Sequence, residues 1–294
     1  MSRDVLTSLI IGSDGVIGHA LTCKLRNMGM RVIETTRRQD TISSQRIFLD
    51  LAQNIHDWQP PQVAIAFLLA AETSLIACQQ YPEITSRINV ENTTLIARKI
   101  CASGGRVIFM STNRVFDGSI PYRKPDEQVC PVVEYGRQKA HAEANLLDIE
   151  PKNSILRITK ILPPTLLLFQ NWIKRLQEGL PIQAFRDMKM APVTLDLITS
   201  VLTHIAHEPV DGILHISGPE DISYYDAARH IADRMGASLA LVEGNLSTDT
   251  SIGKVIPPME HTTLSMSDQI HKWGFTAIPS MQVLDSVYQL ETYL

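Results

Sequence analysis

The first half of the chain alternates short apolar runs with longer amphipathic stretches, and this alternation limits the possible folds more than any other feature. The apolar runs, which we expect to be strands, are Val5–Ile11, Arg31–Thr35, Val63–Leu69 and Arg106–Met110. Helical patterns lie between them, at Val16–Met28 and Pro82–Cys101. Runs such as AIAFLLAA are apolar throughout, as expected of strands buried on both faces. The pattern predicts an α/β protein with a doubly wound parallel sheet covered by helices.

The second half of the chain has shorter elements that are punctuated by prolines. Helical patterns cover Thr165–Glu178, Thr194–His207 and Ser223–Met235, and a strand-like run covers Gly212–Ile216. We therefore expect a first domain at residues 1–158 and a smaller α/β lobe, mainly at residues 159–294. Strands from the second half can still join the main sheet.

The composition excludes several classes of protein. The chain has 294 residues, of which 44% are hydrophobic and 20% charged, as is typical of soluble globular proteins. A net charge of -4 gives no reason to expect nucleic acid or an anionic membrane as partner. No apolar segment reaches the length of a membrane span, and the first residues lack the pattern of a signal peptide. The 4 scattered cysteines favour reduced thiols over disulfides or a metal site, so we expect a cytoplasmic protein without bound metal.

Three glycines, Gly12, Gly15 and Gly18, lie directly between the first expected strand and the first expected helix. Glycine adopts positive φ without strain and lets another backbone or a phosphate approach closely. The free N–H groups at the start of the following helix can bind an anion. A dinucleotide-binding fold requires its glycines at this first turn, so we predict a dinucleotide site here rather than an ordinary turn.

The end of the second strand indicates which dinucleotide binds. This segment reads Thr36-Arg37-Arg38, and guanidinium groups match the charge and geometry of a 2′-phosphate. The sequence therefore favours NADP over NAD. Two alternatives stay open: Glu34 can serve as the acid that binds the ribose of NAD, and the two arginines can form an ordinary solvated loop.

Asp50 and Leu51 come just after a further short strand. The carboxylate of Asp50 can accept a hydrogen bond from the adenine amino group of a bound cofactor. Asp50 can equally serve as the N-cap of a following helix.

The segment EYGRQKAHAE places Tyr135 and Lys139 four residues apart in a helical pattern. Side chains at this spacing project from the same face of a helix. A single Tyr-x-x-x-Lys arises easily by chance, so the spacing alone establishes only proximity.

Four motifs in this order resemble the extended short-chain dehydrogenase/reductases: the three glycines, Ala70-Ala71, Ser111-Thr112 and Tyr135-x-x-x-Lys139. Within that superfamily, STNRVFDGSIPYRKPDEQVCPVVEYGRQKAHAE is similar to the dTDP-4-dehydrorhamnose reductase family, whose members carry Ser-Thr-Asp-Tyr-Val-Phe-Asp-Gly, a Pro-Tyr stretch and Tyr-Gly-x-x-Lys. The likeness continues through INVENTTLIARKI, FRDMKMAPVTLDLITSVLTHI and DGILHISGPEDISYYDAARHI. It implies a Rossmann-type NADP(H)-binding domain followed by a smaller lobe that holds a sugar nucleotide.

The resemblance also implies a role for each catalytic candidate. Tyr135 protonates the carbonyl oxygen as hydride arrives, and the Thr112 hydroxyl hydrogen-bonds the same carbonyl. Lys139 lowers the pKa of the tyrosine and holds the nicotinamide ribose. Implied cofactor contacts are Gly12, Asp14, Gly15, Val16, Ile17, Gly18, Thr36, Arg37, Arg38, Asp50, Leu51, Ala70, Ala71, Thr73, Tyr135 and Lys139.

The chain departs from the family pattern at Asn113-Arg114, where the family has Asp-Tyr. Asparagine lacks the carboxylate charge, and Arg114 replaces a neutral aromatic ring with a cation, so the substrate can differ. The candidate substrate-binding residues are Ser111, Asn113, Arg114, Arg186 and Lys189. Arg186 and Lys189 can meet a diphosphate or can be plain surface charge, and Thr194 nearby can cap a helix.

The leading prediction is an NADPH-dependent oxidoreductase that reduces a keto group on a nucleotide-linked deoxysugar, in polysaccharide or glycoside precursor synthesis. One alternative is an NADP-binding regulatory subunit, because the beta subunit of methionine adenosyltransferase is similar to this family. A second is a nucleotide-sugar epimerase. The expected partner is a small-molecule substrate, with neither nucleic acid nor membrane, and a homodimer is compatible with the resemblance.

Overall fold

The computed structural model describes residues 7–289, except for the side chains of Ile252 and Lys254. The chain divides into two compact units. Unit 1 contains the chain up to Phe116 together with Gln128–Arg157 and Ile198–Leu214. Unit 2 contains Asp117–Glu127, Ile158–Leu197 and the chain from His215. The chain therefore crosses into unit 2 for the short segment Asp117–Glu127, and it returns to unit 1 for Ile198–Leu214 after the first long part of unit 2.

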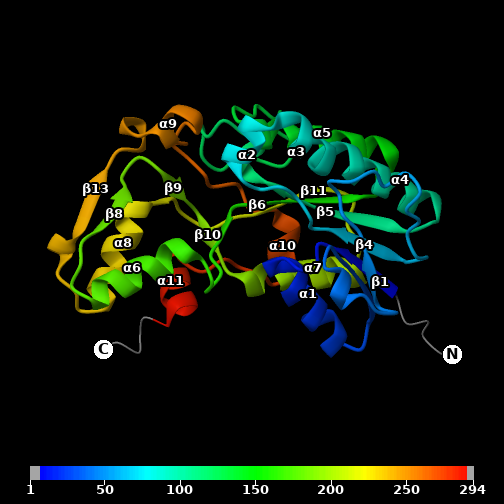
Figure 1. The fold of residues 1–294 in the computed structure, drawn as a ribbon, viewed down its shortest axis with the longest axis horizontal. Coiled ribbons are helices and arrows are strands. Elements are labelled where there is room, and N and C mark those ends of the chain that lie inside the picture. The colour runs from blue at the N-terminus through cyan, green and yellow to red at the C-terminus, as the bar shows by residue number, and fades with distance from the viewer. Residues whose placement is uncertain (1–6, 290–294) are drawn as a thin grey trace. The chain divides into compact units, whose positions relative to one another are not determined.

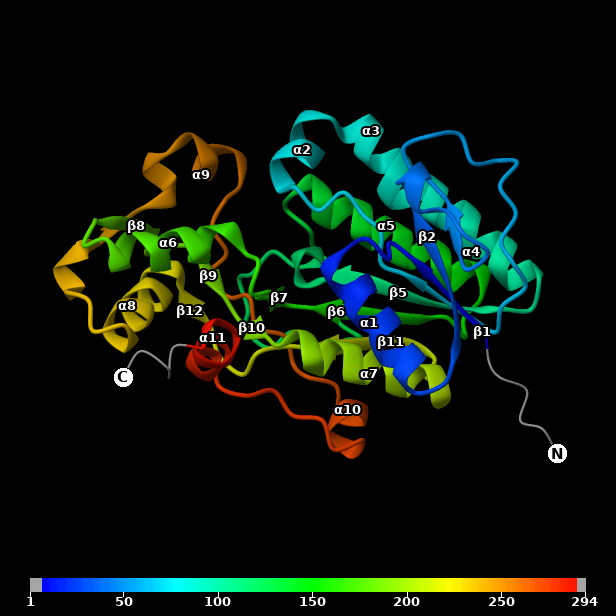
Figure 2. The ribbon, with the colours of Figure 1, turned by 60° about the horizontal axis from the view of Figure 1, so that its bottom comes forward.

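A seven-stranded sheet forms the centre of the fold, in the order β11-β6-β5-β4-β1-β2-β3. The strands are β1 (Thr7–Ile11), β2 (Arg31–Thr36), β3 (Arg46–Phe48), β4 (Ile65–Leu68), β5 (Arg106–Thr112), β6 (Ser154–Ile158) and β11 (Gly212–Ile216). The pairs β1–β2, β1–β4, β2–β3 and β4–β5 are parallel. Helices cover both faces, with α1 and α7 on one and α4 and α5 on the other (Figures 1 and 2). This arrangement confirms the predicted doubly wound α/β fold.

The helices that cover the sheet are α1 (Val16–Asn27), α2 (Leu75–Gln80), α3 (Pro82–Ser86), α4 (Thr93–Ala102), α5 (Glu134–Ile149) and α7 (Leu195–His207). Short turns of other helix types are η1 (Gln39–Thr41), η2 (Arg87–Asn92) and η3 (Asn113–Val115).

The sequence predicted one continuous helix at Pro82–Cys101, but the structure interrupts it with a π-helical turn, η2. Two buried asparagines of this turn bond to backbone groups outside the helix. Asn89 bonds to the backbone of Glu72, and Asn92 donates to the carbonyl oxygens of Leu51 and Gln53. The hydroxyl of Thr93 donates to the carbonyl oxygen five residues earlier, which matches the wider π turn. Hydrophobic periodicity does not reveal such tertiary bonds.

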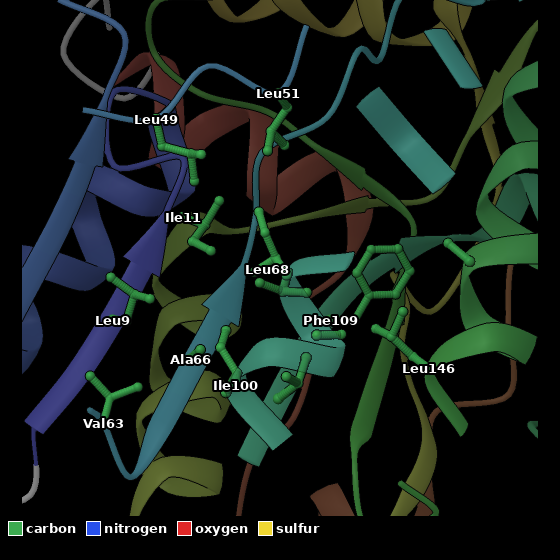
Figure 3. Close-up of a cluster of buried hydrophobic side chains, with 14 of the residues drawn as sticks. Leu9, Ile11, Leu49, Leu51, Val63, Ala66, Leu68, Ile100, Phe109 and Leu146 are labelled. Atoms are coloured by element: carbon green, nitrogen blue, oxygen red, sulfur yellow. The ribbon is translucent and has the colours of Figure 1, made fainter. Parts of the chain in front are cut away.

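The core of unit 1 lies between the sheet and the helices α4 and α5. Alternate residues of β1 and β4, including Leu9 and Leu68, point to one face of the sheet, and Phe109 on β5 joins them (Figure 3). Ile100 on α4 and Leu146 on α5 pack against this face. Each fully buried aliphatic or aromatic side chain contributes roughly 1.5–3 kcal/mol to stability. The packing fixes where the carboxyl ends of β1, β4 and β5 emerge.

Unit 2 contains three two-stranded ladders, β10–β7, β12–β9 and β13–β8. Its strands are β7 (Lys160–Ile161), β8 (Ile182–Phe185), β9 (Lys189–Met190), β10 (Pro192–Val193), β12 (Ile222–Ser223) and β13 (Val242–Asn245). Its helices are α6 (Leu167–Gln177), α8 (Tyr224–Arg234), α9 (Ser251–Val255), α10 (Asp268–Lys272) and α11 (Ser280–Tyr288), with short turns η4 (Leu239–Leu241) and η5 (Ser247–Asp249). In the described part of the chain, no helix combines the length and apolar character that crossing a bilayer requires.

The second unit has its own core, built mainly from α6, α8 and α11. Phe169 and Trp172 on α6 are in contact at a tilted angle, with ring centroids 4.9 Å apart, and both are buried with Ile231 of α8 and Leu284 of α11. Helix α8 begins with a capping box, in which the Ser223 side chain accepts from the third helical residue and that residue's carboxylate bonds back. Helices α6 and α8 confirm two of the helical patterns to within two residues at each end.

Candidate active site

The glycine-rich loop connects β1 directly to α1. Gly12 has a φ of +98°, and a Cβ atom there would lie 2.7 Å from the backbone nitrogen of Ala70. A Cβ atom at Gly18 would lie 2.2 Å from the carbonyl oxygen of Gly12. These two glycines are therefore required by the protein itself. A Cβ atom at Gly15 would meet only one atom, at an ordinary 3.4 Å, so this position leaves space at the start of α1 where a phosphate can approach.

Five charged side chains near the carboxyl ends of β1 and β2 form a network that we call the charged corner: Asp14, Arg26, Glu34, Arg38 and Arg46. Arg38 Nη2 lies 2.5 Å from Oδ1 of Asp14, and Arg46 Nη2 bonds the same oxygen. Glu34 is held by Arg26 at 2.5 Å and by Arg46 at 3.1 Å. Three cations thus face two carboxylates.

The pKa of Asp14 reflects this network. Burial raises it, but hydrogen bonds from Arg38 and Thr36, together with the charges of Arg38 and Arg46, outweigh burial and hold the pKa below its usual range. The Thr36 hydroxyl donates to Oδ2 of Asp14 at 2.8 Å. Asp14 is therefore a carboxylate at neutral pH, bonded through both of its oxygens.

The charged corner bears on the sequence-based expectations for cofactor binding. Arg37 and Arg38 are exposed at the end of β2, as a 2′-phosphate site requires. The side chain of Glu34 is only 7% exposed and is paired with two arginines, which argues against a role for it in binding ribose. Arg46 was missed by sequence reasoning. The parallel register of β2 and β3 places Arg46 beside Glu34. In the sequence, the signal for Arg46 was an arginine at the start of the short strand that follows β2.

Asp50 follows β3 and bonds within its own turn. It accepts from the backbone nitrogen of Ala52 at 3.0 Å and from the side chain of Gln53 at 3.1 Å. The alternative that Asp50 caps a following helix is wrong, because the described residues between β3 and β4 form only turns. The nearby Leu51 is buried, and its carbonyl oxygen accepts from Asn92.

The structure brings the Thr112 turn and the start of α5 together. Thr112 ends β5, and its hydroxyl caps η3 by accepting from the backbone nitrogen of Arg114 at 3.2 Å. A Cβ atom at Gly136 would lie 2.1 Å from the carbonyl oxygen of Arg114, so the glycine lets the helix touch this turn. Tyr135 therefore lies at the contact between the two elements, with Lys139 one helical turn further along α5.

The electrostatic surroundings of Tyr135 differ from the implied pattern. Tyr135 is half-buried, and burial raises its pKa above the ordinary value, with smaller raising effects from Cys78 and Glu72. Arg114 is the cation that lowers this pKa. The resemblance gave that role to Lys139, but the ammonium of Lys139 lies over the Phe109 ring, with Nζ 3.8 Å from the ring centroid.

Lys139 itself is buried, with 2% of its surface exposed. Burial lowers its pKa to about 7, and the charge of Glu143 opposes that shift. Glu143 lies one turn further along α5, and its carboxylate is held by Nε and Nη2 of Arg157 at 3.1 and 2.7 Å. Both members of this ion pair are almost completely buried.

Ser111 belongs to the same buried group, because its hydroxyl donates to Oε1 of Glu143. The side chain predicted to meet the substrate thus bonds within unit 1. Sequence reasoning missed Glu143 and Arg157, although their charges inside an apolar strand and helix pattern were a signal. It also missed Asn89, whose amide donates to Gln138 of α5 at 2.8 Å and ties that helix to η2.

Unit 2 contains a cavity of about 330 Å³. Its lining residues are Leu168, Trp172, Gln183, Ala184, Phe185, Met188, Tyr224, Asn245 and Thr250. Three of these residues are aromatic, namely Trp172, Phe185 and Tyr224, and the amides of Gln183 and Asn245 add hydrogen-bonding groups. Such a mixture suits a planar, partly polar ligand.

Arg186 and Lys189, the residues predicted to bind a diphosphate, lie elsewhere in unit 2. The guanidinium of Arg186 lies 3.9 Å from the centroid of the Tyr225 ring and fills the space that Gly244 leaves. Lys189 lies in β9, and neither cation lines the cavity. Thr194 caps α7 by accepting from the backbone nitrogen of Leu197 at 3.2 Å. In the part of the chain that the structure describes, no cluster of histidine, cysteine and acidic side chains could hold a metal ion.

The chain is similar to known proteins in both sequence and structure. The dTDP-4-dehydrorhamnose reductase of Aggregatibacter actinomycetemcomitans is 28% identical over 243 residues, which cover 79% of this chain and 80% of the relative. The methionine adenosyltransferase 2 subunit beta of Pongo abelii is 23% identical, covering 76% of this chain and 71% of the relative. The crystal structure of dTDP-4-dehydrorhamnose reductase from Bacillus anthracis in complex with NADP superposes with a TM-score of 0.80 at 18% identity, covering 97% of this chain and 99% of that one.

The structural match confirms the Rossmann-type fold, and a family profile settles the membership that the motifs indicated. The profile of the RmlD substrate binding domain matches residues 6–266, which is most of the chain. This chain belongs to the RmlD substrate binding domain family.

Proposed function

We propose that this protein is an NADPH-dependent reductase that converts a keto group of a nucleotide-linked deoxysugar to an alcohol. Unit 1 binds NADPH, and unit 2 binds the nucleotide part of the substrate. The observation that carries the proposal is the contact of Gly136 with the Arg114 carbonyl, which joins the Tyr135 helix to the Thr112 turn. That contact lies at the carboxyl end of β5, in the same parallel sheet as the glycine loop after β1, which is where such folds bind dinucleotides.

The chain's own residues divide the reaction as follows. NADPH, when bound, supplies the hydride. Tyr135 donates its phenolic proton to the carbonyl oxygen as the carbon gains the hydride, while the hydroxyl of Thr112 hydrogen-bonds the same oxygen. The phenol of Tyr135 is protonated at neutral pH, and burial raises its pKa further, so the proton stays on Tyr135 until the carbonyl oxygen gains negative charge. The neighbouring charge of Arg114 stabilises the phenolate that remains.

The charged corner supports NADPH as the preferred dinucleotide. Its three arginines exceed its two carboxylates, and the exposed Arg37 adds a further cation beside them. A 2′-phosphate is the one part of NADPH that NADH lacks, and it carries negative charge that this surplus can balance.

The cavity of unit 2 supports a nucleotide as the bound end of the substrate. Its volume is about 330 Å³, within the usual range of small-ligand sites. The lining includes the aromatic residues Phe185 and Tyr224, against which a base can pack, and Gln183 and Asn245, whose amides can pair with its polar edge. The cation at Arg114, where relatives of the reductase family have a tyrosine, suggests a sugar that differs from dTDP-4-dehydrorhamnose.

The direct test is NADPH oxidation, followed by absorbance, with a panel of dTDP-, UDP- and GDP-linked 4-keto sugars. Turnover of one panel member, together with its loss in Tyr135→Phe, would support the proposal and name the substrate class. Tight NADPH binding without turnover of any sugar would contradict it. That second result would favour a regulatory subunit, for which the match to the methionine adenosyltransferase subunit and the presence of Arg114 are the supporting observations.

The oligomeric state and the cellular location of the protein remain predictions. The resemblance is compatible with a homodimer, which analytical ultracentrifugation would test. A cytoplasmic location follows from the biosynthetic role that we propose, and cell fractionation would test it.

A further inference from the structure

We propose that Asp14 reduces the preference of this protein for NADPH over NADH, because its carboxylate competes with the 2′-phosphate of NADPH for Arg38 and Arg46. This inference rests on the proposed cofactor site in unit 1. It concerns a negative charge that belongs to the glycine loop itself and stands where the loop meets the end of β2.

The contacts of Asp14 show the competition. Oδ1 accepts from Nη2 of both Arg38 and Arg46, and Oδ2 accepts from the hydroxyl of Thr36 at 2.8 Å. These donors are of the kind that a 2′-phosphate needs, namely two guanidinium groups and one hydroxyl. The carboxylate of Asp14 is the common acceptor for these three donors.

The two arginines differ in how easily they can exchange partners. Arg46 is 23% exposed and already bonds Glu34 through its other terminal nitrogen, so both of its terminal groups face carboxylates. Arg38 is 60% exposed, and within residues 7–289 Asp14 is the carboxylate with which it forms an ion pair, at the end of a flexible side chain. A bound phosphate would therefore draw Arg38 away from Asp14 first, while Arg46 stays anchored by Glu34.

The same charge acts against NADPH in a second way. A phosphate that binds beside Arg38 lies near the carboxylate of Asp14, and two anions at short range repel each other. NADH has only a hydroxyl at that position and requires no exchange of partners. Asp14 therefore weakens NADPH binding while leaving NADH binding nearly unaffected. It thus reduces the preference for NADPH over NADH that the arginines create.

The test compares NADPH and NADH dissociation constants for the wild type and for Asp14→Asn, measured by fluorescence titration on the full chain. Removing one unit of negative charge near the phosphate should tighten NADPH binding by roughly tenfold, whereas NADH binding should change less than about twofold. Asp14→Ser, which shortens the side chain, should act in the same direction and guards against a loop distortion peculiar to asparagine.

Asp40→Asn is the matched control. Asp40 lies on η1, and its charge also acts on Arg38, but it makes no hydrogen bond to that arginine among those that the structure gives. We expect Asp40→Asn to change the NADPH dissociation constant much less than Asp14→Asn does, because its carboxylate takes up no donor that the phosphate needs.

Three outcomes would overturn the inference. Weaker NADPH binding by Asp14→Asn would mean that Asp14 prepares the arginines for the phosphate. Equal changes for NADPH and NADH would mean that it only shapes the loop, and an equal effect of Asp40→Asn would reduce it to general electrostatics. In each case a wild type that still prefers NADPH keeps the proposed function intact. A wild type that binds neither cofactor would overturn both.

Discussion

The charged corner and the Tyr135–Lys139 site lie in the same unit, yet they handle charge in opposite ways. In the corner, arginines and carboxylates pair with one another, partly in contact with solvent. At the start of α5, burial moves the pKa of Tyr135 up and that of Lys139 down to about 7. Recognition of a phosphate needs permanent charges that can change partners. Proton transfer needs groups whose protonation is adjustable, which burial provides.

The largest expected effect comes from Tyr135→Phe, which removes the proton donor from the buried site. Reduction should fall by about 10³-fold in kcat/KM, since a positioned acid contributes on the order of 10²–10⁴. NADPH affinity should stay within a few-fold, because the phenol acts mainly in the transition state. Normal turnover by this variant would show that another group donates the proton.

The next effect concerns stability and contrasts a buried ion pair with an exposed one. Glu143→Gln leaves Arg157 buried without its carboxylate and should lower the free energy of unfolding by about 3–5 kcal/mol, as breaking buried pairs does. The control is Asp211→Asn in the pair with Arg106, where Asp211 is 62% exposed and the loss should stay below about 1 kcal/mol. Urea denaturation of both variants measures the difference, and equal losses would contradict the contrast.

Replacing the exposed cations tests the charged corner. The double variant Arg37→Ala/Arg38→Ala should weaken NADPH by roughly tenfold or more and NADH by far less, because only NADPH presents a phosphate to these side chains. Arg31→Ala is a suitable control, since Arg31 is exposed at the opposite end of β2. Equal losses for both cofactors in the double variant would place the 2′-phosphate elsewhere.

The smallest effect is a pH dependence of the buried site. Since the pKa of Lys139 is lowered to about 7, its ammonium is present below that pH and is lost as the pH rises through it. The resemblance implies that Lys139 holds the nicotinamide ribose, and kcat/KM for NADPH reports on groups of the cofactor-free enzyme. We therefore expect kcat/KM for NADPH to fall above pH 7. Glu143 raises this pKa, so Glu143→Gln should move the fall to lower pH. Lys139→Arg keeps its charge at all these pH values and should abolish the fall, whatever its overall activity.

Sequence reasoning and structure agree where the information is local. The strand at Gly212–Ile216 has the predicted bounds, and α1 ends within one residue of its pattern, because period and burial are encoded along a single segment. Predictions were less complete where the hydrogen bonds of a side chain depend on residues far away in the sequence. The π-helical turn η2 breaks a helix that periodicity would continue, since Asn89 and Asn92 bond to backbone in other segments.

The chain's own residues thus determined the alternating fold, the glycine turn and the spacing of Tyr135 and Lys139. Only the tertiary structure decided how these groups are charged and paired. Parallel pairing of β2 and β3 set Arg46 beside Glu34, within reach of Asp14, and packing against β5 turned Lys139 onto Phe109. The physical reason is that pKa values and ion pairs depend on burial and on neighbours brought together by the sheet, and neither property is written in local sequence.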